Sequence, residues 1–220
     1  MVLSRLLKKP FALSPKSVTG IKVAIHVAIL FHIAALFYLG VTDNLGADPV
    51  KSLLHTTGNW AVNMLMITLL VSPVAKWIPF PGLMRFRRML GIYSFVYALV
   101  HFATYCAFEI QFDWSLITSE IVKRPYITVG FTALLMLLAL TVTSPNAIRR
   151  RLGARWQSLH NSIYLIGILA LLHYTWSQKT LFGDSLFYWA ILAVLLVIRR
   201  DRLISIVTPG RQRQRKRPTI

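Results

Sequence analysis

The chain has 220 residues, enough for one domain or a small pair. Lysine and arginine number 25 against 7 acidic residues, which gives a formal net charge of +18, yet 55% of the residues are apolar and 15% are charged. Because ordinary soluble domains carry about 25% charged residues, this composition excludes a disordered chain and argues against a soluble enzyme. The single cysteine, Cys106, excludes an intrachain disulfide.

Long apolar stretches dominate the sequence. A helix needs about 20 apolar residues to cross a bilayer. Six stretches approach this length, at residues 18–41, 53–75, 89–110, 125–143, 157–176 and 186–198, and the last is short unless it begins near Leu181. We therefore expect an all-α fold, a polytopic membrane bundle of six transmembrane helices over residues 18–200, preceded by a basic segment, 1–17, and followed by a basic tail, 201–220.

Residues that are typical of helix ends agree with these limits. Asp48-Pro49 is typical of an N-cap followed by proline at the first helical position, so the second helix is expected to begin before its apolar run. Pro125 is placed to open the fourth helix in the same way, and Pro145 to stop it.

The positive charges predict the topology. When the N-terminus is placed in the cytoplasm, every basic residue except Lys51, Lys123, Arg124 and Lys179 falls in a cytoplasmic segment. The positive-inside rule therefore puts both termini in the cytoplasm. The same placement of the basic residues accounts for the high positive net charge, because basic loops and tails beside a membrane meet anionic lipid headgroups. We therefore expect no nucleic-acid partner.

Two of the six histidines are expected to share a depth in the membrane. His101 lies 13 residues into the third stretch and His173 lies 13 residues beyond His160 on the fifth, which is roughly 20 Å of helical rise in each case. Both helices run outward, so the two side chains should lie at one level. Neutral imidazole is a usual axial ligand of haem, and this geometry suits two imidazoles on one haem iron.

His160 marks a second level, nearer the cytoplasm. The third helix offers no histidine there, and His26 on the first helix is the candidate partner by depth. Thirteen residues at about 100° each leave roughly 220° after whole turns, so a straight helix does not aim His160 and His173 the same way. A bend is needed, or the two histidines face different partners.

Other interpretations of the histidines remain open. A single membrane histidine is often only a hydrogen-bonding side chain between helices, and this applies most to His26, His32 and His55. A proton relay or metal transporter fits the spacing too, although no carboxylate lies in the span centres. No GxGxxG or GxxxxGK[ST] motif occurs, which excludes a separate flavin or NAD(P)H domain but not a flavin held among the helices.

Four segments together resemble the MsrQ (YedZ) family of haem-binding membrane subunits, which belong with the ferric-reductase-like transmembrane proteins. They are LGADPVKSLLHTTG, RRMLGIYSFVYALVHFATY, RPYITVG and RRRLGARWQSLHNSIYLIGILALLHYTWS, and the resemblance extends over residues 18–200. It implies a b-type cytochrome of the bacterial inner membrane that passes electrons from respiratory quinol to MsrP, a periplasmic molybdenum-containing subunit that reduces methionine sulfoxide in oxidised proteins. It also implies FMN as a second cofactor.

In the same resemblance, His101, His160 and His173 correspond to the family's haem-ligand histidines. Many ferric-reductase relatives carry two histidines on the third helix, whereas this chain has Arg87 or Arg88 where the second would fall. One or two haem b groups are therefore expected. Because no nucleophile or catalytic dyad stands out, sulfoxide chemistry is expected on the partner. The alternatives are a transmembrane ferric reductase, and a small transporter or assembly protein whose histidines hold metal or relay protons.

Overall fold

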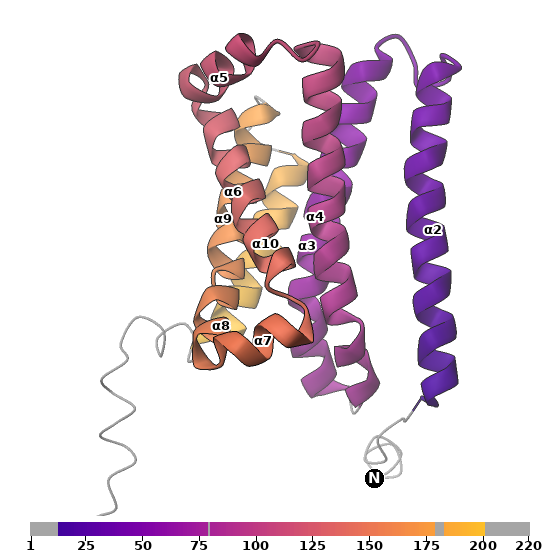
Figure 1. Cartoon of the computed structure of the whole chain (residues 1–220), viewed down its shortest axis with the longest axis vertical. Coiled ribbons are helices and arrows are strands. Elements are labelled where there is room, and N and C mark those ends of the chain that lie inside the picture. Colours follow the sequence, from indigo (N-terminus) through magenta and orange to yellow (C-terminus); the bar gives the residue numbers. More distant parts are fainter. Residues whose placement is uncertain (1–12, 79, 179–182, 201–220) are drawn as a thin grey trace, which may run out of the picture.

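The computed structural model describes residues 13–78, 80–178 and 183–200, and the regular elements in these ranges are all helices. Six of them run along the long axis of the molecule (Figure 1): α2 (Pro15–Val41), α3 (Pro49–Trp77), α4 (Arg87–Thr104), α6 (Pro125–Val142), α9 (Ile163–Ser177) and α10 (Asp184–Ile198). Shorter elements join them: η1 (Pro81–Arg85), the π-helix η2 (Tyr105–Glu109), α5 (Trp114–Lys123), α7 (Asn146–Leu152) and α8 (Ala154–His160). The expected basic segments at the two ends, residues 1–12 and 201–220, lie outside the described residues.

The helices make this a multi-pass membrane protein. Within the described residues, four helices are long and apolar enough to cross a bilayer: 15–41, 49–75, 87–109 and 125–142. The other two expected spans are shorter than these four, because α10 has 15 residues and the stretch 157–176 is divided at Asn161–Ser162 into α8 and α9. An all-helical membrane fold is thus confirmed, while a count of six crossings stays a prediction.

The expected helix boundaries follow from their capping residues. The side chain of Asp48 accepts a hydrogen bond from the Lys51 N–H at 2.9 Å, and Pro49 occupies the first turn of α3. Pro125 opens α6, which ends at Val142 shortly before Pro145. These are the positions where a carboxylate satisfies an orphan N–H and where proline costs no hydrogen bond, so the sequence prediction of these boundaries is confirmed.

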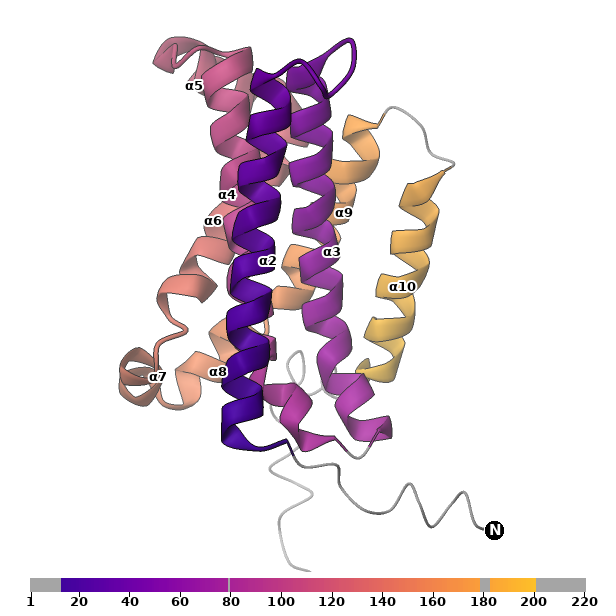
Figure 2. The same ribbon diagram turned by 90° about the vertical axis from the view of Figure 1, so that its right-hand side faces the viewer.

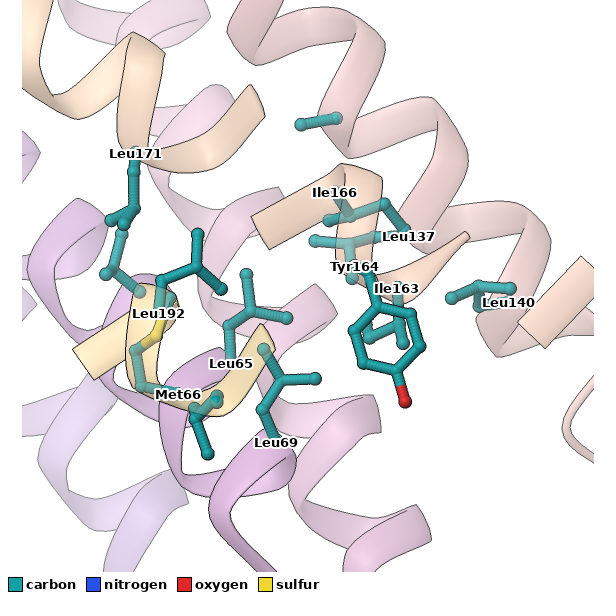
Figure 3. Close-up of a cluster of buried hydrophobic side chains, with 13 residues drawn as sticks. Leu65, Met66, Leu69, Leu137, Leu140, Ile163, Tyr164, Ile166, Leu171 and Leu192 are labelled. Carbon is teal, nitrogen blue, oxygen red and sulfur yellow. The ribbon is translucent and has the colours of Figure 1, made fainter. Parts of the chain in front are cut away.

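The core is packed chiefly by α3, α4, α6, α9 and α10. α3 packs along α4, α6 along α9, and α10 against both α9 and α3. Figure 3 shows a cluster of apolar side chains from α3, α6, α9 and α10, in which Leu65, Leu69, Ile166, Leu171 and Leu192 are almost completely buried. Because lipid tails are as apolar as leucine, such close packing is what holds helices together in a membrane. α2 lies to one side of this core, next to α3 and α4 (Figures 1 and 2).

A buried arginine supplies a hydrogen-bond donor that α3 lacks. Pro73 lies inside α3 and has no N–H, so the carbonyl of Leu69 loses its helical donor. Arg199, directly after α10, is 8% exposed, and its Nη2 donates to that carbonyl at 2.7 Å. Its Nη1 donates to the Tyr164 hydroxyl at 2.6 Å. Arg199 thereby ties the end of α10 to α3 and α9.

The segment 111–124, between the third and fourth expected spans, contains α5. Two consecutive residues with positive φ, Gln111 (52°) and Phe112 (58°), turn the chain after η2. Asp113 then caps α5 by accepting hydrogen bonds from the N–H groups of Ser115 and Leu116, a start signal that is present in the sequence. We call this end of the bundle the α5 end, and the opposite end, which carries α7 and α8, the α7 end (Figure 1).

Candidate functional site

A cavity of about 510 Å³ lies between α3, α4, α6 and α9 and reaches the α5 end. This volume is within the range of about 300–1,000 Å³ that is typical of ligand sites. Apolar side chains line its deep part, among them Val62, Leu65, Leu134, Leu137 and Ala170. Among the residues that the structure describes, the charged ones that line it are confined to helix ends at the α5 end, namely Asp48, Lys51, Glu109 and Arg124.

His101 and His173 face one another across this cavity. His101 comes from α4 and His173 from α9, and both line the cavity wall. The centroids of their imidazole rings are 6.0 Å apart, and the ring planes are inclined at 76°. The structure thus brings together the two histidines that the sequence places at one depth.

Each of these rings is held by a backbone carbonyl. Nδ1 of His101 lies 3.0 Å from the carbonyl oxygen of Leu54 on α3, and Nδ1 of His173 lies 2.7 Å from that of Tyr126 on α6. A carbonyl only accepts, so Nδ1 carries the hydrogen, and in a neutral imidazole Nε2 then keeps its lone pair. A metal-binding histidine is usually oriented in this way, by a hydrogen bond from its other ring nitrogen.

A glycine makes room for each ring. Gly58 follows Leu54 by four residues, and Gly130 follows Tyr126 by four, so each glycine lies one helical turn beyond the carbonyl that holds the histidine. A Cβ atom on Gly58 would lie 3.2 Å from two atoms of the His101 ring. On Gly130 it would lie 2.6 Å from Nδ1 of His173, closer than real Cβ contacts. This pairing of glycine and carbonyl was not predicted from the sequence, although both glycines are visible there.

The geometry fits two axial imidazoles on one metal ion. Imidazole nitrogens bind first-row metal ions at about 2.0–2.1 Å, so two imidazoles on opposite sides of one ion have ring centroids roughly 6 Å apart. The rings of His101 and His173 have this separation, in a cavity that is large and mostly apolar. No group of three or more His, Cys, Asp or Glu side chains suited to a metal ion occurs among the described residues, and His101 and His173 are a set of two facing imidazoles. A haem, which brings four nitrogen ligands of its own, matches such a set.

His160 and His26 occupy different places. Nε2 of His160 is 3.1 Å from the Thr143 hydroxyl, and its ring stacks on Trp156 with centroids 4.0 Å apart. Nδ1 of His26 bonds to the hydroxyl of Tyr93 on α4. Because α2 and α8 lie on different sides of the bundle (Figure 1), the structure does not bring His26 and His160 together. His160 and His173 therefore face different partners, which is one of the two outcomes expected from their spacing.

The remaining two histidines bond to neighbouring side chains. His32 lies 2.9 Å from the Tyr97 hydroxyl and meets the Trp60 ring edge-on. His55 lines the cavity at the α5 end and lies 3.3 Å from the side-chain nitrogen of Gln178. Both therefore have the inter-helix hydrogen bonds expected of single membrane histidines.

The bundle and its cavity are those of a ferric-reductase-like transmembrane protein: residues 57–171 match the family model described as "Ferric reductase like transmembrane component". The "Protein-methionine-sulfoxide reductase heme-binding subunit MsrQ" of Salmonella enteritidis PT4 is 43% identical over 191 residues, which are 86% of this chain and 96% of that relative. Relatives with the same name in Salmonella paratyphi B and Salmonella heidelberg are 43% identical over 188 residues, 85% of this chain and 94% of each. The chain belongs to the MsrQ family, so the resemblance in the sequence analysis is confirmed.

Proposed function

We propose that this chain is a haem-binding electron-transfer subunit of a methionine sulfoxide reductase system. The observation that most supports this proposal is the arrangement of His101 and His173. Nδ1 of each ring is hydrogen-bonded to a backbone carbonyl, and the ring centroids are 6.0 Å apart inside a mostly apolar cavity. The printed name of the relatives, a heme-binding subunit, supports it. We assign these two histidines as the axial ligands of one haem b, and His160 as a ligand of a second haem where one is bound.

Bound haem supplies one-electron chemistry at its iron, and the protein supplies position and surroundings. When haem is bound, His101 and His173 would hold its iron through Nε2, because Nδ1 of each ring is on a carbonyl. The carbonyls of Leu54 and Tyr126 fix the orientation of the two rings and increase their basicity. The apolar side chains of the deep cavity exclude water, and burial of this kind is one of the factors that set the redox potential of a haem.

We propose the membrane orientation from the charge distribution, and the direction of electron flow from the family resemblance. Arg85, Arg88, Arg149, Arg150 and Arg151 lie at or beside η1, α4 and α7, so we place the α7 end and both termini in the cytoplasm. The α5 end then faces the periplasm of a bacterium, and the protein lies in the inner membrane. Electrons pass from respiratory quinol through the haem to MsrP, which reduces oxidised periplasmic proteins. FMN is part of this proposal through the family resemblance alone.

The test is a dithionite-reduced minus oxidised absorption spectrum of the detergent-purified protein, with extracted haem quantified per chain. A b-type spectrum is expected, with one haem per chain for the His101–His173 site alone and two if the His160 site is also filled. Colourless protein that is folded and was produced with ample haem would contradict the proposal and favour a histidine-based transporter or assembly protein.

Single substitutions test the ligands. His101→Ala and His173→Ala should each abolish the low-spin haem spectrum of the His101–His173 site, because one axial bond is lost. His32→Ala is the matched control, since His32 is a membrane histidine that bonds to Tyr97 outside the cavity. Unchanged haem content in both ligand variants would overturn the assignment.

The family model also favours a second candidate, a transmembrane ferric reductase. The two functions share the haem site and differ in the acceptor. Reduced protein in membranes should be reoxidised by a periplasmic methionine sulfoxide reductase in the first case and by ferric chelates in the second. Stopped-flow reoxidation with each acceptor separates them.

A further inference from the structure

We propose that the two carboxylate groups of the haem point to the α5 end of the cavity and are bound there by Lys51 and Arg124. This inference rests on the proposed function, because it concerns the haem of the His101–His173 site. Haem b carries both carboxylates on one edge of the macrocycle, so the distribution of polar groups around the cavity decides which way that edge points.

The deep part of the cavity is unsuited to carboxylates. Its lining is mostly apolar, with side chains such as Leu65 and Leu134, and the hydroxyl of the polar lining residue Ser94 already donates to the carbonyl of Ala61. From Lys51 to Leu65 there are 14 residues of helix, roughly 21 Å along α3. Charges buried at that depth without partners would carry a large desolvation cost, whereas the apolar edge of the macrocycle loses nothing there.

Lys51 lies at the beginning of α3, close to the carbonyl that holds His101. It precedes Leu54 by three residues, so it lies about one turn nearer the α5 end, and it lines the cavity. The ammonium group is a point charge on a flexible stem with three donors, which suits a carboxylate whose position is set by the iron ligands.

Arg124 has the corresponding place on the other side. It is the N-cap of α6 and precedes Tyr126, whose carbonyl holds His173, by two residues. Its Nε bonds to Glu120 at 2.6 Å, and its Nη1 donates to the Tyr126 hydroxyl at 3.3 Å. A guanidinium has five N–H donors, so further donors remain beyond these two bonds. Each histidine thus has, on the helix that holds it, one cation two or three residues nearer the α5 end.

Acidic residues at the same end limit the strength of this binding. Asp48 lines the cavity but already caps α3, and Glu120 is paired with Arg124. Glu109, at the end of η2, also lines the cavity and is exposed. It therefore repels an incoming carboxylate, and we expect the two cations to contribute the modest amount typical of exposed ion pairs.

The experiment compares haem with its dimethyl ester, which has the same macrocycle and iron but uncharged side chains. Full-length apoprotein in detergent is titrated with each, in wild type, Lys51→Gln and Arg124→Gln. Each substitution should weaken haem binding about fivefold, equivalent to about 1 kcal/mol, and leave ester binding unchanged. Lys123→Gln is the control, since Lys123 is an exposed cation on α5 that does not line the cavity.

Ester binding also reports that each variant is folded. Wild-type protein that binds haem and ester equally well, with both variants equal to wild type, would overturn the carboxylate assignment while leaving the haem site intact. Equal losses for haem and ester in the variants would overturn it too, since they would show a purely structural role. Wild-type protein that binds neither compound would instead contradict the proposed function.

Discussion

The imidazole rings of His101 and His173 are nearly perpendicular, with an angle of 76° between their planes. Perpendicular axial imidazoles interact about equally with the two π-type d orbitals of a low-spin ferric iron, so these orbitals stay close in energy. The oxidised protein should therefore give a strongly anisotropic low-spin EPR signal with one very large g value. A rhombic signal would show that the rings do not keep this angle around iron, and a high-spin signal would show that one of them is not a ligand.

The two glycines beside these rings should differ in their tolerance of alanine. A Cβ at position 130 would lie 2.6–2.8 Å from three atoms of the His173 ring, whereas at position 58 the shortest distance to the His101 ring is 3.2 Å. Gly130→Ala should displace His173 and weaken haem binding about tenfold, or about 1.4 kcal/mol, and Gly58→Ala should do so less. Haem per chain and the reduced spectrum measure this.

Gly20→Ala on α2 provides the control for these substitutions. No atom lies within 4 Å of a Cβ at Gly20, and alanine favours a helix over glycine, so haem content should be unchanged. Gly130→Ala protein with full haem and an unaltered spectrum would show that the ring of His173 is not confined by α6.

The contribution of the Arg199–Leu69 hydrogen bond to the free energy of unfolding should depend on Pro73. Arg199→Leu leaves the buried carbonyl of Leu69 without a donor, and this should lower the free energy of unfolding by about 1–3 kcal/mol. In a Pro73→Ala background the residue at position 73 has an N–H for that carbonyl, so the same substitution should cost less. A double-mutant cycle of unfolding in detergent measures the coupling, and strictly additive effects would contradict it.

The arginine has a second bond that needs its own control. Tyr164→Phe removes the hydroxyl that accepts from Nη1 of Arg199, without altering α3. Its effect on the free energy of unfolding should be the same with proline or alanine at position 73. A dependence on position 73 here would show that the coupling does not pass through the Leu69 carbonyl.

The start of α5 should be sensitive to acid. Hydrogen bonds from Ser115 and from the Leu116 N–H hold the pKa of Asp113 below its ordinary value of 3.8. A group whose pKa is lower in the folded state adds stability above its unfolded pKa, and this contribution is lost as the pH falls through the folded pKa. Hydrogen exchange at α5, corrected for the intrinsic rate, should therefore accelerate at low pH. Asp113→Asn keeps a capping side chain that does not titrate, so α5 in that variant should show no such change.

The sequence predicted the helices well, because each depends on a local pattern. The apolar stretches and the pairs Asp48-Pro49 and Arg124-Pro125 are local signals, and the structure begins α3 and α6 at these prolines. The division of the fifth stretch at Asn161–Ser162 was harder to see, since the residues around it are compatible with a continuous helix. α5 was missed because the capping signal at Asp113 was not used.

The site was only partly predictable, for a related reason. Periodicity places His101 and His173 at one depth, since rise per residue is a fixed property of a helix. The groups that hold them are backbone carbonyls of Leu54 and Tyr126, and every residue has a carbonyl, so no residue type marks them. The contact of Arg199 with Leu69 likewise joins residues 130 positions apart, which no local pattern reveals.

His101 and His173 lie on helices that pack on α3 and α6, and these provide the carbonyls and glycines of the site. In order of synthesis, the half with Leu54, Gly58 and His101 leaves the ribosome well before His173. On the proposed assignment, the cofactor cannot be fully enclosed until the C-terminal third of the protein has entered the bilayer. Bound haem then joins α4, which is made early, to α9, which is made late. Haem supply therefore affects the stability and maturation of newly made chains as well as their redox activity.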